Sequence, residues 1–383
     1  MRYALFFLSL ISVTLYAQNS LRVQNTNFTI SQGSFNPTET SRYQYNYNRL
    51  RLYYDYKTSN YFFHATADGI SYVEENFIES NSFYYIKQLH SDTPFSTQSS
   101  WREYNKAALG AKIYRLYGGY QDDSNRVVAG LQNITMGVGH IWTPSNLFNP
   151  KNSYALEPDE TYGVLALSYT RYIGLESQVY GVVSQKKDNS IKAATGFQTT
   201  LGTLEIGMNA IYSKSTKMLG YTLQSDISDT GVQIRSEGAF IRGDILTSAS
   251  MQEEKNFFQG ILGVDYAFES GLNLTLETLY SSQKFNYEEF MLNYIRELAN
   301  NLTLSHLYFG TTLDYDFSIY LSASLLYIES FNKENSRFIS PTLNYTINDN
   351  NVITLGTQLY GGSKKSEFGM WDNSYYFKYV FSY

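Results

Sequence analysis

The end of the chain sets the strictest limit on its fold. Five aromatic residues occupy alternate positions up to the last residue, and they are Tyr375, Phe377, Tyr379, Phe381 and Tyr383. Successive residues of a β-strand point to opposite sides, so the five rings would share one face. Such a face is a costly exposed patch in water, whereas a lipid-facing strand needs one. The alternation predicts the last strand of a transmembrane β-barrel rather than of a soluble sandwich.

The same alternation recurs along the chain. In the segment 272–282, Leu272, Leu274 and Leu276 alternate with polar residues. The repeating unit is a strand of roughly 9–12 residues followed by a turn, as membrane barrels require. After residue 17 no apolar run approaches the roughly 18 residues of a membrane-spanning helix. These patterns predict an all-β protein, a single closed antiparallel transmembrane β-barrel of about eighteen strands, with sixteen as the alternative.

Connections between the expected strands should alternate in length, because short turns lie at one end of such a barrel and longer loops at the other. The expected short turns are rich in Gly, Asn and Asp, and they are Asp122–Asn125, Ile173–Gly174, Leu201–Gly202, Ser228–Gly231, Glu269–Gly271, Asp316 and Asn348–Asn350. The expected long loops are Gly139–Glu160, Arg242–Lys255, Gln283–Asn300 and Gly361–Asn373.

The N-terminal region divides into three parts. Residues 1–17 resemble a signal peptide, with a short basic start at Arg2 and an apolar run from Ala4 to Leu15; a signal anchor is the alternative. Residues 18–42 are polar and turn-rich, and we expect a periplasmic N-terminal segment there. The transmembrane barrel is expected over 43–383. Its first strands are predicted at Tyr45–Tyr56, Tyr61–Ile70, Phe83–His90, Leu109–Tyr120 and Arg126–Gly137.

Barrels of about 16–18 strands enclose water, so polar residues on their inward faces line an aqueous lumen. The alternation places both charge signs there, which predicts no strong ion selectivity, and most of these residues would have no individual role. The expected lumen-facing residues are Arg49, Arg51, Asp55, Glu176, Lys186, Glu205, Arg235, Glu237, Glu277, His306, Asp314 and Lys378.

The segment 137–152 reads GVGHIWTPSNLFNPKN and follows a Gly-Leu-Gln at Gly130–Gln132. This stretch resembles a signature of porin-like outer-membrane β-barrel families of Gram-negative bacteria. In those proteins a Gly-x-Gln strand runs into a loop that starts at a Gly and reaches Pro-x-x-x-Phe-Asn-Pro. The corresponding residues here are Gly137, Pro144, Phe148, Asn149 and Pro150. Some members carry Trp–Gly where this chain has Met136–Gly137.

The resemblance implies a loop that folds inward and narrows the channel. Trp142, Leu147 and Phe148 support an inward position, because they are too apolar for a free loop. The alternative is a latch that only packs against the wall. The expected constriction residues are Trp142, Pro144, Phe148, Asn149, Pro150, Lys151, Glu157, Asp159 and Glu160, and their charges would set selectivity.

Catalytic and cofactor chemistry find little support. The chain has no Cys and only 4 His residues, without His-x-x-x-His spacing, so no metal site or cofactor is expected. His140 lies near Ser145, but no Gly-x-Ser-x-Gly motif accompanies them. A barrel hydrolase is therefore the third alternative, and no enzyme activity is expected. The net charge of −6 argues against nucleic acid as a partner.

The function that the sequence favours is passive diffusion of small hydrophilic solutes through a porin-like channel in the cell outer membrane. The alternative is a structural or adhesive barrel with a blocked lumen. The expected partners are outer-membrane lipid, small solutes and, through the C-terminal strand, the barrel-assembly machinery. Assembly as a homo-trimer is compatible with such a barrel.

Overall fold

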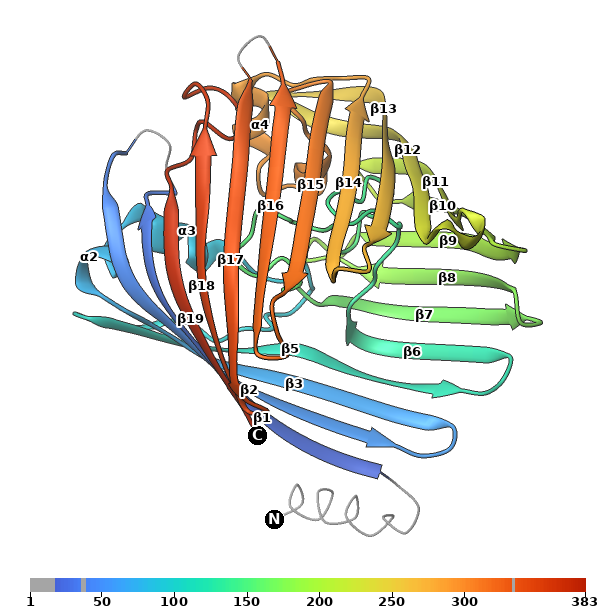
Figure 1. Cartoon of the computed structure of the whole chain (residues 1–383), viewed down its shortest axis with the longest axis horizontal. Coiled ribbons are helices and arrows are strands. Elements are labelled where there is room, and N and C mark those ends of the chain that lie inside the picture. The colour runs from blue at the N-terminus through green and yellow to red at the C-terminus, as the bar shows by residue number, and fades with distance from the viewer. Residues whose placement is uncertain (1–17, 36–38, 333–334) are drawn as a thin grey trace.

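A computed structural model of the protein describes residues 18–35, 39–332 and 335–383; the predicted signal peptide lies outside them. Its sheet has 19 strands, all paired antiparallel, and the three-residue strand β4 (Arg102–Tyr104) lies outside the ring. β1 pairs with both β2 and β19, so the other eighteen strands form a closed barrel (Figure 1). The predicted fold class is confirmed.

The ring strands are β1 (Gln18–Gly33), β2 (Arg42–Lys57), β3 (Tyr61–Val73), β5 (Ala107–Gln121), β6 (Asn125–Gln132), β7 (Val164–Ile173), β8 (Ser177–Gln185), β9 (Ile191–Leu201), β10 (Leu204–Tyr212), β11 (Thr216–Asp226), β12 (Val232–Ser248), β13 (Met251–Ala267), β14 (Leu272–Ser281), β15 (Leu307–Asp316), β16 (Leu321–Phe331), β17 (Ser336–Asn348), β18 (Asn351–Gly361) and β19 (Ser374–Ser382). The helices are α2 (Glu75–Ile78), α3 (Asn81–Gln88), α4 (Tyr287–Asn293), η2 (Ser228–Thr230) and η3 (Ala299–Asn301). No helix in the described part of the chain is long and apolar enough to cross a membrane.

Two predictions near the N-terminus are wrong, and they cancel in the strand count. Residues 18–42 are not a periplasmic segment, because β1 occupies most of them and closes the ring. Phe83–His90 is not a strand, because most of it belongs to α3, whose N-cap Ser80 accepts a hydrogen bond from the Phe83 amide. Phe83 is fully buried against Trp101 and Tyr72, so its ring packs inside the barrel rather than facing outward.

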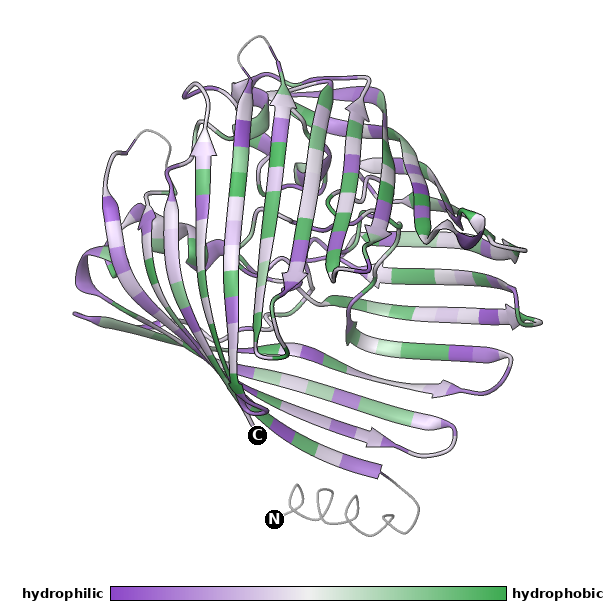
Figure 2. Cartoon of the chain, viewed as in Figure 1, coloured by the Kyte–Doolittle hydropathy of each residue, from purple (hydrophilic) through white to green (hydrophobic). Residues whose placement is uncertain are grey.

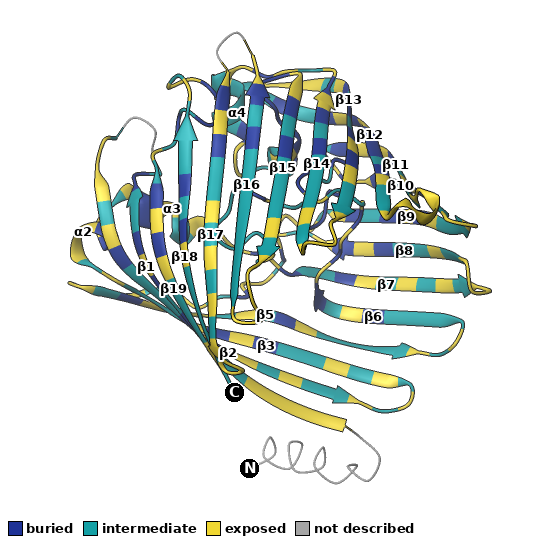
Figure 3. Cartoon of the chain, viewed as in Figure 1, coloured by how far each residue is buried: buried dark blue, intermediate teal, exposed yellow. Residues whose placement is uncertain are grey.

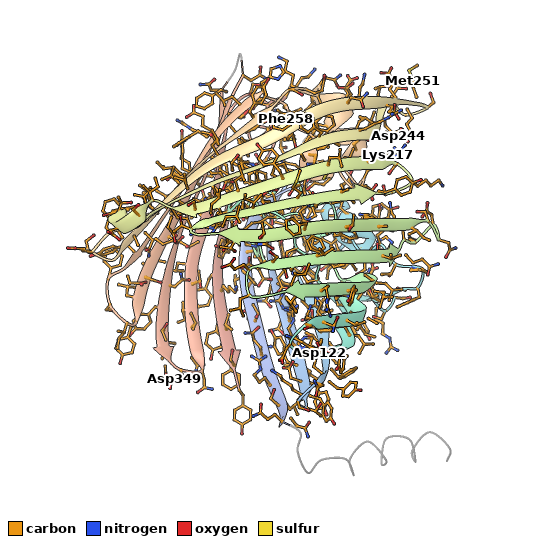
Figure 4. All side chains as sticks on the ribbon, turned by 90° about the vertical axis from the view of Figure 1, so that its right-hand side faces the viewer. Asp122, Lys217, Asp244, Met251, Phe258 and Asp349 are labelled. Atoms are coloured by element: carbon orange, nitrogen blue, oxygen red, sulfur yellow. The ribbon has the colours of Figure 1, made fainter. Side chains whose placement is uncertain are left out.

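All the predicted short turns lie at junctions of consecutive strands, and Asp316 is the last residue of β15. Asp122 and Asp349 mark two of them, and Met251 lies toward the opposite end of the barrel (Figure 4). We call these two ends the turn end and the loop end. The predicted long loop Arg242–Lys255 is wrong, because β12 and β13 stay paired to Leu246 and Gln252. The outward side chains there are charged, as in the Arg242–Glu254 ion pair at 2.7 Å. These charges made the ends of the two strands look like a loop in the sequence.

Hydrophobic and hydrophilic residues follow one another in short bands along the strands (Figure 2). Buried and exposed positions alternate in strands such as β10, which places successive side chains on the two faces of the wall. Three chain segments fold into the interior from the loop end, namely residues 74–101, 133–163 and 282–306. They pack with inward side chains into three apolar clusters. Buried residues of β15–β18 accordingly lie in the parts of those strands nearer the loop end (Figure 3).

Candidate functional site

The loop between β6 and β7, residues 133–163, crosses the barrel interior, and we call it the inner segment. It makes hydrogen bonds to inward side chains of strands around the whole ring. Its partners include Arg49 on β2, Lys192 on β9, Glu237 on β12 and Gln358 on β18. Because these strands lie on different sides of the ring, the segment must span the lumen.

Glu237 on β12 holds the first part of the inner segment. Its Oε2 accepts hydrogen bonds from the backbone amides of Val138 and Gly139 at 2.8 and 3.0 Å. Its Oε1 accepts from the amide and hydroxyl of Ser145, both at 2.8 Å. Gly137 has φ +92°, and a Cβ there would lie 2.5 Å from Oε2 of Glu237. Only a glycine therefore lets the backbone approach this carboxylate.

Glu277 on β14 continues the same arrangement. It accepts hydrogen bonds from three consecutive amides, those of His140, Ile141 and Trp142, at 2.9, 3.0 and 2.8 Å. Arg235 on β12 donates to the same carboxylate through Nε at 3.2 Å. The side chains of Glu277 and Arg235 are both fully buried. We call Glu237 and Glu277 the carboxylate pair, because together they bind the backbone of residues 138–145.

The last part of the inner segment binds the opposite wall with the roles reversed. Here the segment contributes the carboxylates and the wall contributes the positive charges. Both Nη atoms of Arg49 donate to Glu157 at 2.9 Å. Arg51 donates to Glu160 at 2.7 and 2.9 Å, and its Nε and Nη2 donate to Asp68 on β3 at 2.6 and 2.8 Å. We call these five residues the arginine cluster. The two arginine side chains are each only 4% exposed, and fork-shaped pairing of this kind is geometrically specific.

Further groups of the wall surround the arginine cluster. The Arg51 guanidinium lies 3.9 Å from the centre of the Tyr114 ring. Arg115 on β5 donates to the carbonyl oxygen of Thr161 at 2.8 Å, and Lys378 on β19 donates to Glu157 at 3.3 Å. Burial alone would raise the pKa of Glu160, but hydrogen bonds from Arg51 and the charges of Arg49 and Arg51 outweigh it, lowering the pKa to about 2.

The middle of the inner segment is apolar and self-braced. Trp142, Leu147, Phe148 and Asn149 are buried, and Pro144 is buried beside them, with Pro150 half-buried. The Trp142 indole N–H donates to the Tyr154 hydroxyl at 3.0 Å. The Asn149 side chain accepts from the amide of Ile134 at 2.8 Å and donates to the carbonyl oxygen of Tyr162 at 2.7 Å. These bonds fix the segment's path across the lumen.

Loops at the loop end close over the segment. Glu297 pairs with Lys192 at 2.9 Å and with Lys186 at 3.2 Å. Glu367 is buried and accepts hydrogen bonds from the Tyr308 hydroxyl and, at 3.3 Å, from the Leu304 amide. Burial raises the pKa of Glu367 to about 7, although the bond from Tyr308 acts in the opposite direction. These contacts join the 282–306 and 362–373 loops to the wall.

Two cavities border the inner segment. The one toward the loop end has a volume of ≈ 490 Å³ and is lined by aromatic side chains that include Tyr45, Tyr47, Tyr72 and Trp142. The one toward the turn end has a volume of ≈ 330 Å³, and inward Gln, Ser, Thr and Asn residues of β6–β11 line it. Glu157 of the arginine cluster also lines the aromatic cavity. The segment thus separates an aromatic chamber from a polar one.

The remaining predicted lumen residues fall in different places. Asp55 pairs with His64 at 2.6 Å on the inward face, and Asp314 accepts a hydrogen bond from Ser324. Lys186 lies just beyond β8 and reaches inward to Glu297. Glu176 is wrong as a wall residue, because it lies exposed in the turn between β7 and β8. In the inner segment Lys151 is half-buried, and Asp159 is exposed.

Sequence reasoning missed Asp68, Lys112, Arg115 and Asp265, which extend the two charged groups. Asp265 forms an ion pair with Arg235 and lies 3.3 Å from His140. Asp68 could have been found, since it follows His64 and Thr66 at alternate positions of a predicted strand. Arg115 could not, because a bulge between Ile113 and Arg115 breaks the alternation there.

Within the described residues, His140 and Ser145 bind different partners and do not form a hydrogen bond with each other. The Nδ1 of His140 lies 3.3 Å from Asp265, whereas the Ser145 hydroxyl is buried and donates to Glu237. Among the described residues no group of three or more His, Asp or Glu could hold a metal ion. The hydrogen bonds and ion pairs described above position the inner segment.

Comparison with known proteins gives a fold likeness and no closer relation. No family model and no curated protein matches the chain. The fold is similar to Acinetobacter baumannii OccAB1 (TM-score 0.62, 11% identity, 96% of each chain covered). It is also similar to Pseudomonas aeruginosa OpdK with vanillate (0.59, 10%, 96% and 98%) and to a BenF-like porin of Pseudomonas fluorescens Pf-5 (0.58, 10%, 95% and 98%).

Proposed function

We propose that the protein is an outer-membrane channel through which small hydrophilic solutes diffuse passively, with the inner segment as its constriction. The observation that carries this proposal is a segment anchored on opposite walls of an eighteen-strand ring, with a cavity on each side. A closed barrel leaves no unpaired strand edge, as a membrane requires. Two proteins of similar fold support the proposal. One is described as a BenF-like porin, and the other, OpdK, has a structure with vanillate.

The charges at the constriction are paired with charges of opposite sign. Arg49 and Arg51 face Glu157, Glu160 and Asp68, and Arg235 faces Glu277 and Asp265. Such pairing leaves little net charge for a permeating ion, so we expect weak ion selectivity. The resemblance to the porin-like signature at Gly137, Pro144 and Phe148 supports the role of residues 142–160 as a constriction.

The outer face of the barrel and the two ends of the chain support the proposed location in the outer membrane. Tyr375, Phe377 and Phe381 lie exposed on β19, as lipid contact and delivery to a barrel-assembly machinery would need. In this proposal residues 1–17 are a signal peptide for export. The turn end then faces the periplasm and the loop end the exterior.

A barrel with a blocked lumen is the second candidate, and a specific observation favours it. The inward faces of β7–β13 carry Ala166, Val182, Ile211, Ile241 and Phe257, which are buried beneath the inner segment and the 282–306 loop. At these positions the wall is covered by apolar packing. In the channel proposal a conducting path would have to pass the cavities on the two sides of the inner segment rather than this packed region.

Single-channel conductance of the refolded chain in a planar bilayer tests the proposal. The variant shortens the inner segment by replacing residues 139–160 with a Gly/Ser linker. The control removes residues 248–251 from the β12–β13 hairpin tip, outside the interior. We expect steady conductance that rises in the variant and stays unchanged in the control. Absence of conductance in all three chains would establish the blocked barrel, and unchanged conductance in the variant would remove the constriction role.

A further inference from the structure

One buried carboxylate takes no part in anchoring the inner segment. Glu367 lies in the loop between β18 and β19 and is only 8% exposed. Its Oε2 accepts the hydrogen bonds from the Tyr308 hydroxyl and the Leu304 amide. Its Oε1 accepts no hydrogen bond within the described residues, and no cation among them pairs with this carboxylate. A buried carboxylate without a cation is costly, so a positively charged partner would stabilise it.

Glu367 lines the aromatic cavity on the loop-end side of the inner segment. That cavity has a volume of ≈ 490 Å³, and sites for small molecules commonly have volumes of about 300–1,000 Å³. Of the described residues, only two other charged side chains line it, Lys151 and Glu157. Glu157 already pairs with Arg49 and Lys378. Glu367 is therefore the negative charge that remains for a ligand.

Aromatic rings lie around this carboxylate. Phe368 follows Glu367 in the chain, and its ring centre is 5.3 Å from that of Tyr154. Burial raises the pKa of the Tyr154 hydroxyl, and the nearby charge of Glu367 raises it further. The Trp142 indole N–H donates to the same hydroxyl. These three rings and that of Trp371 all line the cavity. The face of an aromatic ring attracts a cation that lies against it.

We propose that the aromatic cavity binds an organic cation with an alkylated ammonium group, and that Glu367 pairs with it. The proposal names a class of solute for the channel proposed above and rests on that function. An alkylated ammonium has no N–H group, so ring faces and one carboxylate oxygen can satisfy it. A primary ammonium carries three donors, whereas Glu367 offers a single free oxygen.

Calorimetric titration of the refolded full chain in micelles at pH 8 tests the proposal with three related probes. Choline carries a trimethylammonium group, 3,3-dimethylbutan-1-ol is its uncharged counterpart, and ethanolamine carries a primary ammonium. We expect choline to bind about tenfold more tightly than either of the other two probes. Absence of choline binding, or equal affinity for choline and either other probe, would overturn the proposal.

A pair of variants tests the role of Glu367. Glu367→Gln removes the charge and keeps an oxygen that can accept the bonds from Tyr308 and Leu304. We expect its affinity for choline to fall about tenfold. Asp372→Asn changes an exposed carboxylate of the same loop, and it should bind choline as the parent chain does. Unchanged affinity in Glu367→Gln, or an equal loss in both variants, would remove Glu367 from the site.

A pH series on the parent chain tests the same charge without any substitution. Burial raises the pKa of Glu367 to about 7, so this carboxyl is mostly neutral at pH 6 and mostly charged at pH 8. The titratable groups that face it are Tyr308 of β15 and Tyr154 of the inner segment, with Lys151 and Glu157 elsewhere on the lining. We expect the affinity for choline to rise about tenfold from pH 6 to pH 8. An affinity that does not change with pH would contradict the pairing.

Conductance measured on the same preparation separates this proposal from the channel itself. Conductance without choline binding would overturn the cation site and leave the channel in place. Choline binding without conductance would support the cation site inside a blocked barrel, and the proposed function would then be the part that fails.

Discussion

The two ends of the inner segment are held by opposite chemistry. At residues 138–145 the segment contributes backbone N–H groups, and the wall contributes the carboxylate pair. At residues 157–160 the segment contributes carboxylates, and the wall contributes the guanidinium groups of Arg49 and Arg51. The first anchor needs only a backbone of the right shape, so it depends on the wall residues and on Gly137. The second needs a charge on both partners.

This difference assigns different tasks to the two anchors. A buried carboxylate that accepts several amides fixes the backbone in one place, since each bond is short and charge-assisted. An ion pair between side chains can open without moving the backbone of the wall, and it responds to pH. We therefore expect the first end to set the position of the constriction and the second end to be its adjustable side.

The largest expected effect comes from Glu277→Ala. The change leaves three amides without their acceptor and removes one of the two carboxylates that pair with the buried Arg235, which should cost about 3–5 kcal/mol in the stability of the inner segment. Trypsin cleavage after Lys151 measures release of the segment, and we expect it to become faster. Glu269→Ala, at an exposed turn, is the matched control. Equal cleavage rates in the two variants would contradict the anchoring role.

A smaller effect is expected at the other end from Glu160→Gln. Arg51 keeps its bonds to Asp68, so the loss should be about 1–3 kcal/mol. Asp159→Asn changes the neighbouring exposed carboxylate and should alter stability by less than about 0.5 kcal/mol. Urea midpoints of the two variants in micelles give the comparison. If both midpoints move together, the arginine cluster does not hold this end.

The smallest effect is expected on mild acidification. The pKa of Glu160 is lowered to about 2, so its contribution is full above the unfolded value of about 4.5 and is lost as pH falls toward 2. Between pH 7 and pH 4 the loss should stay below about 1 kcal/mol. The difference between the urea midpoints of the parent chain and Glu160→Gln should shrink in this window. A constant difference down to pH 3 would contradict the linkage.

Local patterns predicted the short turns from β5 onward and most of the strands, the exception being the ends of β12 and β13, where a loop was expected at Arg242–Lys255. A half-apolar strand and a Gly- or Asn-rich turn can be recognised from neighbouring residues alone. β1 was not predicted as a strand, because its outward face carries Asn25 and Asn27. These polar residues remove the alternation that marks a lipid-facing strand. Phe83–His90 was wrongly predicted as a strand, because three aromatic residues in a row favour a strand. In the structure the N-cap at Ser80 starts a helix there.

The site was predictable only as separate parts. We expected each of these residues inside the barrel, namely Arg49, Arg51, Glu157 and Glu160. The partners are 108 or 109 residues apart in the sequence, so only the closed barrel brings them together, and their sequence spacing could not reveal the pairing. Glu237 and Glu277 were expected as solvated wall residues. Their binding of backbone amides has no sequence signal, because an amide is present at every position except proline.

The pairing of β1 with β19 makes a seam between the two ends of the described chain. Val23 and Tyr383 exchange two backbone hydrogen bonds of 2.8 Å there. Because β1 and β19 are the first and last strands of the described chain, the ring can close only when every intervening strand is in place. A partly made chain therefore carries two unmatched edges. The same adjacency means that a short linker could join residue 383 to β1, with new ends opened at a loop elsewhere on the ring.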